Sequence, residues 1–332
     1  YERLHLHTVK RHSALPGMAF PADAPRYVSR RRVVDYLGAY ATQFGITPRF
    51  GVEARAIVRT SEGWRTLLVD GSHIDAAHVV VATGANRHAQ WPTFGGADVF
   101  AGRLVHSADY RNAAPFAGQR VLVVGMGNTG AEIALDLCEH GVAVALSVRS
   151  PVNIVYRDVL GRATQESSMM LGRLPTAWGD ALASFFRDRT VGNLSRYGIA
   201  TPRTSPMADL RERGRTPVID VGTVAKIRSG AIRVHPGIER LTENGAVFTD
   251  GSAAQFDVLL AATGYRSGIE AFFTDVQVPV DASGLPTSVI GEGALAGVYF
   301  VGFDTHQPGG LLRSIGLQAH AVAQHISGAA TK

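Results

Sequence analysis

Residues 120–137, RVLVVGMGNTGAEIALDL, join an apolar run, a glycine-rich turn and a stretch with helical spacing. Gly125, Gly127 and Gly130 have the G-x-G-x-x-G spacing, directly after a strand expected at 121–124. In dinucleotide-binding folds the first glycine allows a tight turn, the second lets a pyrophosphate approach the backbone, and the third lets the helix pack on the strand. The stretch therefore predicts an α/β fold with a Rossmann-like nucleotide-binding domain.

The residues that follow this turn indicate which nucleotide is bound. A helix expected to start near Thr129 would direct its first N–H groups, with those of Asn128 and Thr129 among them, at the phosphates. The next expected strand ends at Arg149, with Ser147 and Ser150 beside it, where an acidic residue would hold a ribose 2′-hydroxyl. An arginine suits a 2′-phosphate, so the sequence favours NADPH over NADH. An exposed arginine at a strand end, without a ligand, is the alternative.

An internal repeat explains why the glycine loop lies deep in the chain. Residues 67–84, LLVDGSHIDAAHVVVATG, align without a gap with residues 247–264, VFTDGSAAQFDVLLAATG. Each copy predicts a hairpin at Asp-Gly and then a strand covered on both faces. The copies end at Thr83 and Gly84 and at Thr263 and Gly264, where backbone can approach a ligand at the carboxyl edge of a sheet.

The repeat also predicts a second glycine loop. The loop at Gly125 precedes the second copy, so the first copy should have a loop of its own, roughly 55 residues before Tyr1. We therefore expect this chain to be truncated at its N-terminus, with the first nucleotide loop missing.

Composition narrows the class of protein. The chain has 332 residues, 45% of them hydrophobic and 18% charged, which predicts a soluble protein of two domains. No apolar run approaches the ~20 residues of a membrane span. The single Cys138 excludes an internal disulfide and a cysteine zinc cluster, and no paired metal-ligand spacing occurs, so we expect no metal and a cytoplasmic location. The net charge of +5 lacks the long basic stripe typical of nucleic-acid binding.

Several motifs together resemble one family. Residues 100–110, FAGRLVHSADY, match the F-x-G-x-x-x-H-x-x-x-[FWY] fingerprint of the flavin-containing monooxygenases through Phe100, Gly102, His106 and Tyr110. The chain resembles that family over nearly its whole length, and most closely the YUCCA-like plant branch. The other matching stretches are YERLHLHTVKRHSALPGMAFP at 1–21, GRTPVIDVGTVAKIRSGAIRVHPGI at 214–238, AATGY at 261–265 and GVYFVGF at 297–303.

This resemblance implies a two-dinucleotide flavoprotein plan. Residues 1–88 would form the first part of an FAD domain whose upstream βαβ unit is missing, 89–265 an inserted NADPH domain, and 266–332 the last part of the FAD domain. It implies an NADPH- and FAD-dependent monooxygenase, in which a flavin C4a-(hydro)peroxide passes one atom of O2 to a small organic substrate such as the 2-oxo acid indole-3-pyruvate. The alternatives are another pyridine-nucleotide flavin reductase and a truncated, non-catalytic NADP(H)-binding chain.

The resemblance also implies roles for single residues. His7 lies where relatives have a histidine or asparagine near the flavin, so it is the candidate catalytic donor, with a structural side chain as the alternative. His106 is a cofactor-site candidate whose structural role is favoured. Gly302 and Asp304 precede a helix expected over 311–326, and Asp304 is the candidate for the flavin's ribityl hydroxyls.

The region 153–213 is rich in large apolar side chains, for which an ordinary core is favoured over a substrate wall. These are Met169, Met170, Trp178, Phe185, Phe186 and Tyr197.

Overall fold

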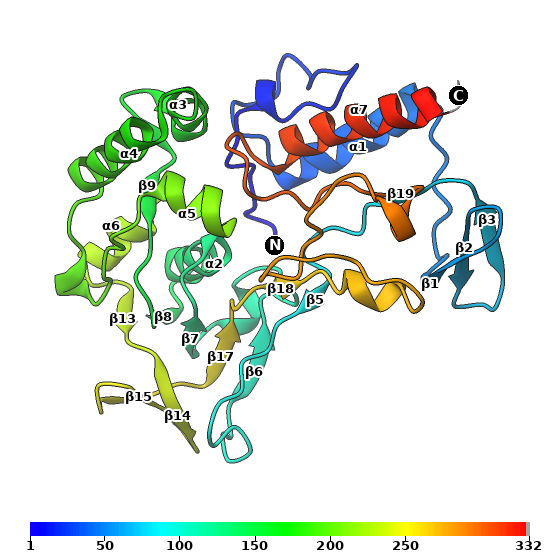
Figure 1. Cartoon of the computed structure of the whole chain (residues 1–332). Helices are drawn as coiled ribbons and strands as arrows, with labels where there is room; N and C mark the ends of the chain where they lie inside the picture. Colours follow the sequence, from blue (N-terminus) through cyan, green and yellow to red (C-terminus); the bar gives the residue numbers. More distant parts are fainter. Residues whose placement is uncertain (330–332) are drawn as a thin grey trace. The chain divides into compact units, whose positions relative to one another are not determined.

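The computed structural model describes residues 1–329 and divides into two compact units (Figure 1). Unit 1 contains Tyr1–Val9 and Ala89–Gly264, and unit 2 contains Lys10–His88 and Tyr265–Lys332. The mixed α/β class expected from the sequence is confirmed. The chain passes between the units three times, so each unit is assembled from segments that are far apart in sequence.

Unit 1 is built on a parallel five-stranded sheet with the order β13-β8-β7-β17-β6. Its strands are β6 (Arg103–His106), β7 (Arg120–Val124), β8 (Ala143–Ser147), β13 (Arg233–His235) and β17 (Val258–Ala261). Helix α2 (Asn128–Glu139) connects β7 to β8, and its apolar face, with Ile133 and Leu137 fully buried, packs in the same core as Val121 and Val123 of β7. This is the strand–glycine turn–helix unit that residues 120–137 predict.

The internal repeat is confirmed at the level of hydrogen bonds. In unit 2, β1 (Ala54–Arg59), β2 (Trp64–Leu68) and β3 (His73–Ala76) form an antiparallel sheet ahead of β4 (Val79–Val81). In unit 1, β14 (Ile238–Thr242), β15 (Gly245–Phe248) and β16 (Ala253–Gln255) do so ahead of β17. The N–H of Ser72 donates to Asp70 Oδ1 at 2.9 Å, and that of Ser252 donates to Asp250 Oδ1 at 3.0 Å.

The strands that end the two copies differ in burial. All four residues of β17 are buried, because β17 lies between β7 and β6. In the part of the chain that the structure describes, β4 pairs only with β19 (Val298–Phe300), and Val80 is 48% exposed. The expectation that Val79–Val81 is covered on both faces is therefore wrong.

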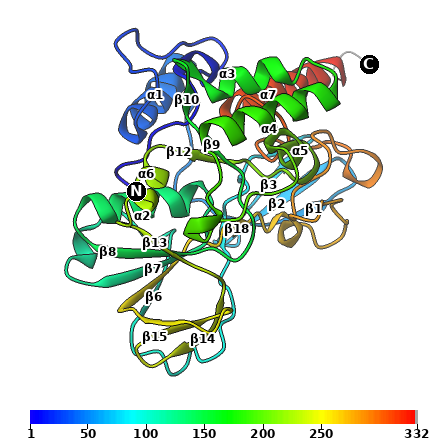
Figure 2. The same ribbon diagram turned by 90° about the vertical axis from the view of Figure 1, so that its left-hand side faces the viewer.

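A helical region in unit 1 corrects a second expectation. The helices α3 (Thr164–Leu171), α4 (Thr176–Thr190) and α5 (Pro206–Arg213) pack as neighbours (Figure 2). Trp178 on α4 is 70% exposed, and Phe185, Phe186 and Met170 are also exposed. An ordinary core is therefore wrong for these four side chains.

Unit 2 has its own core around Trp64, Phe273 and Phe300. Its longest helix, α7 (Leu311–Ala329), extends three residues beyond the end expected from the sequence. The remaining helices and short strands of the two units are α1 (Arg30–Gln43), α6 (Thr223–Arg228), β5 (His88–Ala89), β9 (Ile154–Tyr156), β10 (Asp158–Val159), β11 (Arg162–Ala163), β12 (Val218–Asp220) and β18 (Tyr265–Arg266).

Candidate nucleotide-binding site

Two glycines of the loop between β7 and α2 are required by the protein's own packing. Gly125 has φ +100°, and a Cβ on it would lie 2.8 Å from the carbonyl oxygen of Ala262. A Cβ on Gly130 would overlap the carbonyl oxygen of Gly125. Any larger residue at either position would therefore displace backbone, as expected for the turn glycine and the helix–strand packing glycine.

Gly127 is different, because nothing in the protein requires a glycine there. Its φ of −87° and ψ of −174° are available to every residue, and beyond its two chain neighbours no other residue has an atom within 4 Å of the position a Cβ would occupy. No side chain caps the N-terminus of α2, and its first turn contains no acidic residue. The open space and the helix N-terminus together fit a pyrophosphate that must approach the backbone.

The side chain of Asn128 holds α2 to a neighbouring strand. Its Oδ1 accepts a hydrogen bond from the N–H of Ile219 at 2.7 Å, and its Nδ2 donates to the carbonyl of Pro217 at 3.2 Å. The side chain is therefore occupied with β12. Thr129, the next residue, is half-buried and lies in the first turn of α2.

Arg149 lies two residues beyond the end of β8 and is exposed. None of the acidic side chains in residues 1–329 forms an ion pair with it in this structure, so its charge is available to an anion. Ser147 is instead buried, and its hydroxyl donates to the carbonyl of Pro236 at 2.8 Å. Arg149 and the exposed Ser150 are thus the groups at this strand end that can contact a 2′-phosphate.

The carboxyl ends of β17 and β6 form the other side of the site. The hydroxyl of Thr263 donates to the carbonyl of Gln90 at 2.5 Å, and the N–H of Gln90 donates to the carbonyl of Gly264 at 3.0 Å. Gly264 has φ +86°, the left-handed region that favours glycine. These bonds join residue 90 to the end of β17.

His106, the last residue of β6, is 1% exposed. Burial lowers the pKa of its imidazole, against the smaller effects of Asp109 and the backbone at Gly264. The N–H of Ala108 donates to His106 Nδ1 at 3.1 Å, which places the proton of the neutral ring on Nε2. The ring is 5.4 Å from that of Trp91, a residue that the sequence patterns did not single out.

His7 contacts helix α2. Its Nε2 lies 2.6 Å from Glu132 Oε1, and both side chains are largely buried. Glu132 and Asp136 stand one turn apart on α2, and Asp136 Oδ2 accepts a hydrogen bond from the Tyr110 hydroxyl at 2.5 Å. Burial, together with these carboxylates, raises the pKa of the phenols of Tyr1 and Tyr110. The structure thus gives His7 a structural partner in unit 1, the alternative that the sequence left open.

The flavin-side candidates lie in unit 2, at the carboxyl ends of the parallel strands β4 and β19. Thr83 is exposed, and the position of a Cβ on Gly84 is open space. The N–H of Gly302 donates to Gln318 Oε1 at 2.8 Å, and Asp304 Oδ1 accepts from the N–H of His306 at 2.9 Å. This edge fits part of a flavin nucleotide. A second G-x-G-x-x-G loop is not found among the described residues of unit 2.

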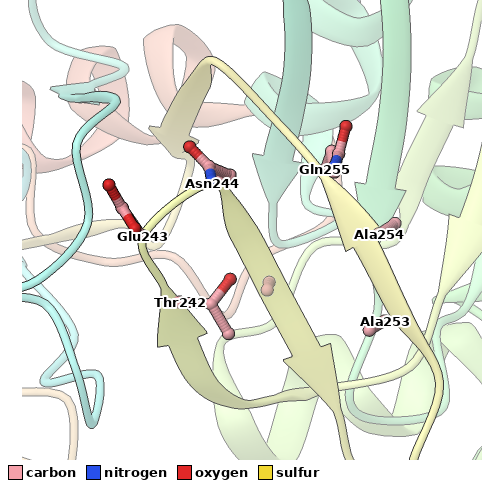
Figure 3. Close-up of a pocket in the computed structure, with 7 residues that line it drawn as sticks. Thr242, Glu243, Asn244, Ala253, Ala254 and Gln255 are labelled. Carbon is pink, nitrogen blue, oxygen red and sulfur yellow. The ribbon is translucent and has the colours of Figure 1, made fainter.

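A pocket on the β14–β16 sheet does not belong to this site (Figure 3). Gln255 and the turn at Glu243 and Asn244 line it, and Gln255 precedes the amino end of β17. Dinucleotides bind at the carboxyl edge of such sheets, and this pocket has one acidic and no basic residue.

Residues 1–329 contain neither a cluster of metal ligands nor a membrane-spanning helix. No group of three or more His, Cys, Asp or Glu side chains there could hold a metal ion. None of the helices in that range has both the length and the apolar character needed to cross a membrane.

Known proteins are similar to this chain in sequence over most of its length. The family model described as flavin-binding monooxygenase-like matches residues 1–283. Indole-3-pyruvate monooxygenase YUCCA1 of Oryza sativa subsp. japonica is 39% identical over 311 residues, which cover 91% of this chain and 76% of that protein. Probable indole-3-pyruvate monooxygenase YUCCA8 of Arabidopsis thaliana is 36% identical over 316 residues, covering 91% and 74%.

Solved structures share the fold at lower sequence identity. The flavin-containing monooxygenase from Stenotrophomonas maltophilia has a TM-score of 0.72 at 23% identity, covering 99% of this chain and 86% of that one. The closed structure of cyclohexanone monooxygenase has a TM-score of 0.69 at 19% identity, covering 100% and 76%.

Proposed function

Because the chain belongs to the flavin-binding monooxygenase-like family, whose members are FAD- and NADPH-dependent, we propose that it oxygenates a small 2-oxo acid of the indole-3-pyruvate class. The curated relatives named for that substrate support the substrate class. We also assign NADPH to unit 1 and the flavin to unit 2, because the glycine loop and Arg149 lie in unit 1.

The observation that carries the nucleotide assignment is the empty space at Gly127. A glycine that neither backbone conformation nor packing requires is explained by a ligand that must come closer than a side chain allows. The two neighbouring glycines carry no such information, because protein atoms account for both.

In this proposal the chain binds and orients its cofactors, and bound FAD supplies the redox chemistry. The N-terminus of α2 holds the pyrophosphate of NADPH, and Arg149 pairs with the 2′-phosphate. The bonds between Gln90, Thr263 and Gly264 fix the backbone at the end of β17, where the rest of the nucleotide passes. The neutral His106 stabilises the same edge. No side chain is required to act as a general acid or base, since orientation and exclusion of water are the protein's contribution.

The test is O2-dependent NADPH oxidation by the full-length protein supplied with FAD. We expect indole-3-pyruvate to stimulate it and one atom of ¹⁸O2 to appear in the product. The Gly127→Val variant, which places a branched side chain where the pyrophosphate must lie, should lose this activity with its melting temperature retained.

Two outcomes would instead support the alternatives. Substrate-independent transfer of electrons to an added acceptor, without ¹⁸O in any organic product, would identify a flavin reductase. Tight NADP(H) binding with no oxidation under any condition would identify a non-catalytic nucleotide-binding chain.

A further inference from the structure

Trp91 is an exposed aromatic side chain at the carboxyl edge of the unit 1 sheet. It is 51% exposed and follows Gln90, whose backbone is bonded at both the N–H and the carbonyl to the end of β17. One side of the indole contacts His106, with the ring centroids 5.4 Å apart and the planes at 56°. The indole of Trp91 thus packs on one side against the buried ring of His106, while about half of the residue's surface is exposed to solvent.

The order of the strands tells which part of a dinucleotide reaches this edge. In the strand order, β8 and β13 lie on one side of β7, and β17 and β6 lie on its other side. Dinucleotides bind across such a switch point, with the pyrophosphate at the helix N-terminus. Arg149, beyond β8, marks the adenosine side. The other half of the nucleotide must therefore extend over the ends of β17 and β6, where Trp91 lies.

We propose that Trp91 is the stacking surface for the nicotinamide ring of NADP(H), and that it binds the oxidised ring more tightly than the reduced one. The inference rests on the proposed nucleotide site and adds a residue and a redox preference to it. The oxidised nicotinamide carries a positive charge, and the indole face is the aromatic surface that attracts a cation most strongly. The reduced ring is neutral and lacks this attraction.

The surroundings of Trp91 favour the charged form of the ring. His106 behind the indole is neutral near pH 7, because burial lowers its pKa, so it does not repel a cation. The exposed indole of Trp91 is therefore backed by a histidine ring that carries no positive charge.

The test compares ligands with and without nicotinamide, using the full chain and measuring binding by calorimetry. The probes are NADP⁺, NADPH and 2′,5′-ADP, which keeps the adenosine and the 2′-phosphate. Trp91→Ala should weaken NADP⁺ about 5- to 30-fold and NADPH by less, while 2′,5′-ADP changes less than about twofold. Trp91→Phe should retain most of the affinity. Trp178→Ala, which removes an exposed tryptophan of α4, is the matched control and should change none of the three.

Fluorescence gives a second measurement. In the Trp178→Phe background only Trp64 and Trp91 emit, and Trp64 is buried in unit 2. NADP⁺ should quench this emission, and 2′,5′-ADP should not. The quenching should disappear when Trp91→Phe is added.

The possible failures can be told apart. If Trp91→Ala leaves NADP⁺ binding unchanged, or weakens NADP⁺ and NADPH equally, the inference is wrong and the nucleotide site stands. If Gly127→Val leaves NADP⁺ binding unchanged, the nucleotide site itself is wrong, and with it the role of Trp91.

Discussion

At the scale of single residues, the three loop glycines differ in what a side chain would meet. We predict that Gly127→Ala leaves the free energy of unfolding within about 0.5 kcal/mol of the parent and greatly weakens NADP⁺, because only the ligand needs that space. Gly125→Ala should cost about 1–3 kcal/mol through its positive φ. Chemical denaturation and calorimetric titration of the two variants measure both quantities. Equal destabilisation by the two substitutions would contradict the assignment.

Arg149 provides a test of coenzyme choice. Arg149→Glu replaces a cation facing the 2′-phosphate by a repelling carboxylate, and a charge-assisted hydrogen bond is worth about 1.5–3 kcal/mol. We therefore expect NADPH to bind at least about 10-fold more weakly and NADH to change little. Dissociation constants for the two coenzymes measure this, with Arg173→Glu, at another exposed arginine of unit 1, as the control. An equal loss for NADPH and NADH would remove Arg149 from the site.

His7 and Glu132 provide a test of whether His7 is structural. His7→Ala leaves a buried carboxylate without its partner, which costs about 1–3 kcal/mol. Glu132→Gln removes the charge, so His7→Ala should cost less in that background. A double-mutant cycle on the free energy of unfolding measures the coupling. Strict additivity would leave the flavin-side role of His7 as the better explanation, and His5→Ala at the exposed neighbour is the control.

Spacing in the sequence predicted the strand, glycine turn and helix of residues 120–137, because backbone turns and strand ends are local. It could not predict that the side chains of Ser147 and Asn128 bond partners about 90 residues away. Trp91 was not predicted, because its position also depends on contacts that are distant in the sequence. Its place at the edge depends on the bonds of Gln90 to residues 263 and 264, and no local pattern encodes that contact.

At the scale of elements, strand β13 contains a histidine, His235, whose protonation should affect the packing of the strand. The ring of His235 stacks on Phe248 with centroids 4.3 Å apart and an interplanar angle of 7°, and burial lowers the pKa of the imidazole below its ordinary 6.5. The unfolded chain therefore takes up a proton before the folded one does. The stabilising contact is fully present above about pH 6.5 and is lost as the pH falls through the lower, folded pKa.

We predict that the melting temperature of unit 1 falls between pH 7 and pH 5, and that His235→Phe makes the fall shallower while keeping the ring contact. The fall should not vanish, because the pKa of His106 is lowered by burial as well. Melting curves at several pH values measure the slope. His73→Gln, at an exposed position of β3, is the control, and an unchanged slope in His235→Phe would contradict the prediction.

The elements also show where periodicity fails. The Asp-Gly turns predicted both hairpins, and the apolar runs after them predicted the strands that follow. They could not distinguish β17, which has neighbours on both sides, from β4, which has one among the described residues. Likewise, the large apolar side chains of 153–213 favoured an ordinary core, and only the tertiary structure shows that Trp178 and Phe185 are exposed.

At the scale of the whole molecule, each unit has a separate hydrophobic core. Gly130→Ala should disrupt the core around β7 and α2, while Trp64 reports the core of unit 2. In a Trp91→Phe, Trp178→Phe background, we expect Gly130→Ala to lower the unfolding midpoint seen by circular dichroism and to leave the Trp64 transition in place. Transitions that shift together would show that the two cores unfold as one cooperative system.

The place of β17 in the unit 1 sheet has a consequence for synthesis on the ribosome. Strand β6 bonds only to β17 among the described strands, and β17 lies about 150 residues later in the chain. At 5–20 residues per second, a nascent β6 waits about 8–30 s for its partner, while β7, α2 and β8 assemble beside it. During that interval Leu104 and Val105 lie on a strand whose backbone N–H and C=O groups have no partner strand, so this segment is exposed to aggregation until β17 is synthesised.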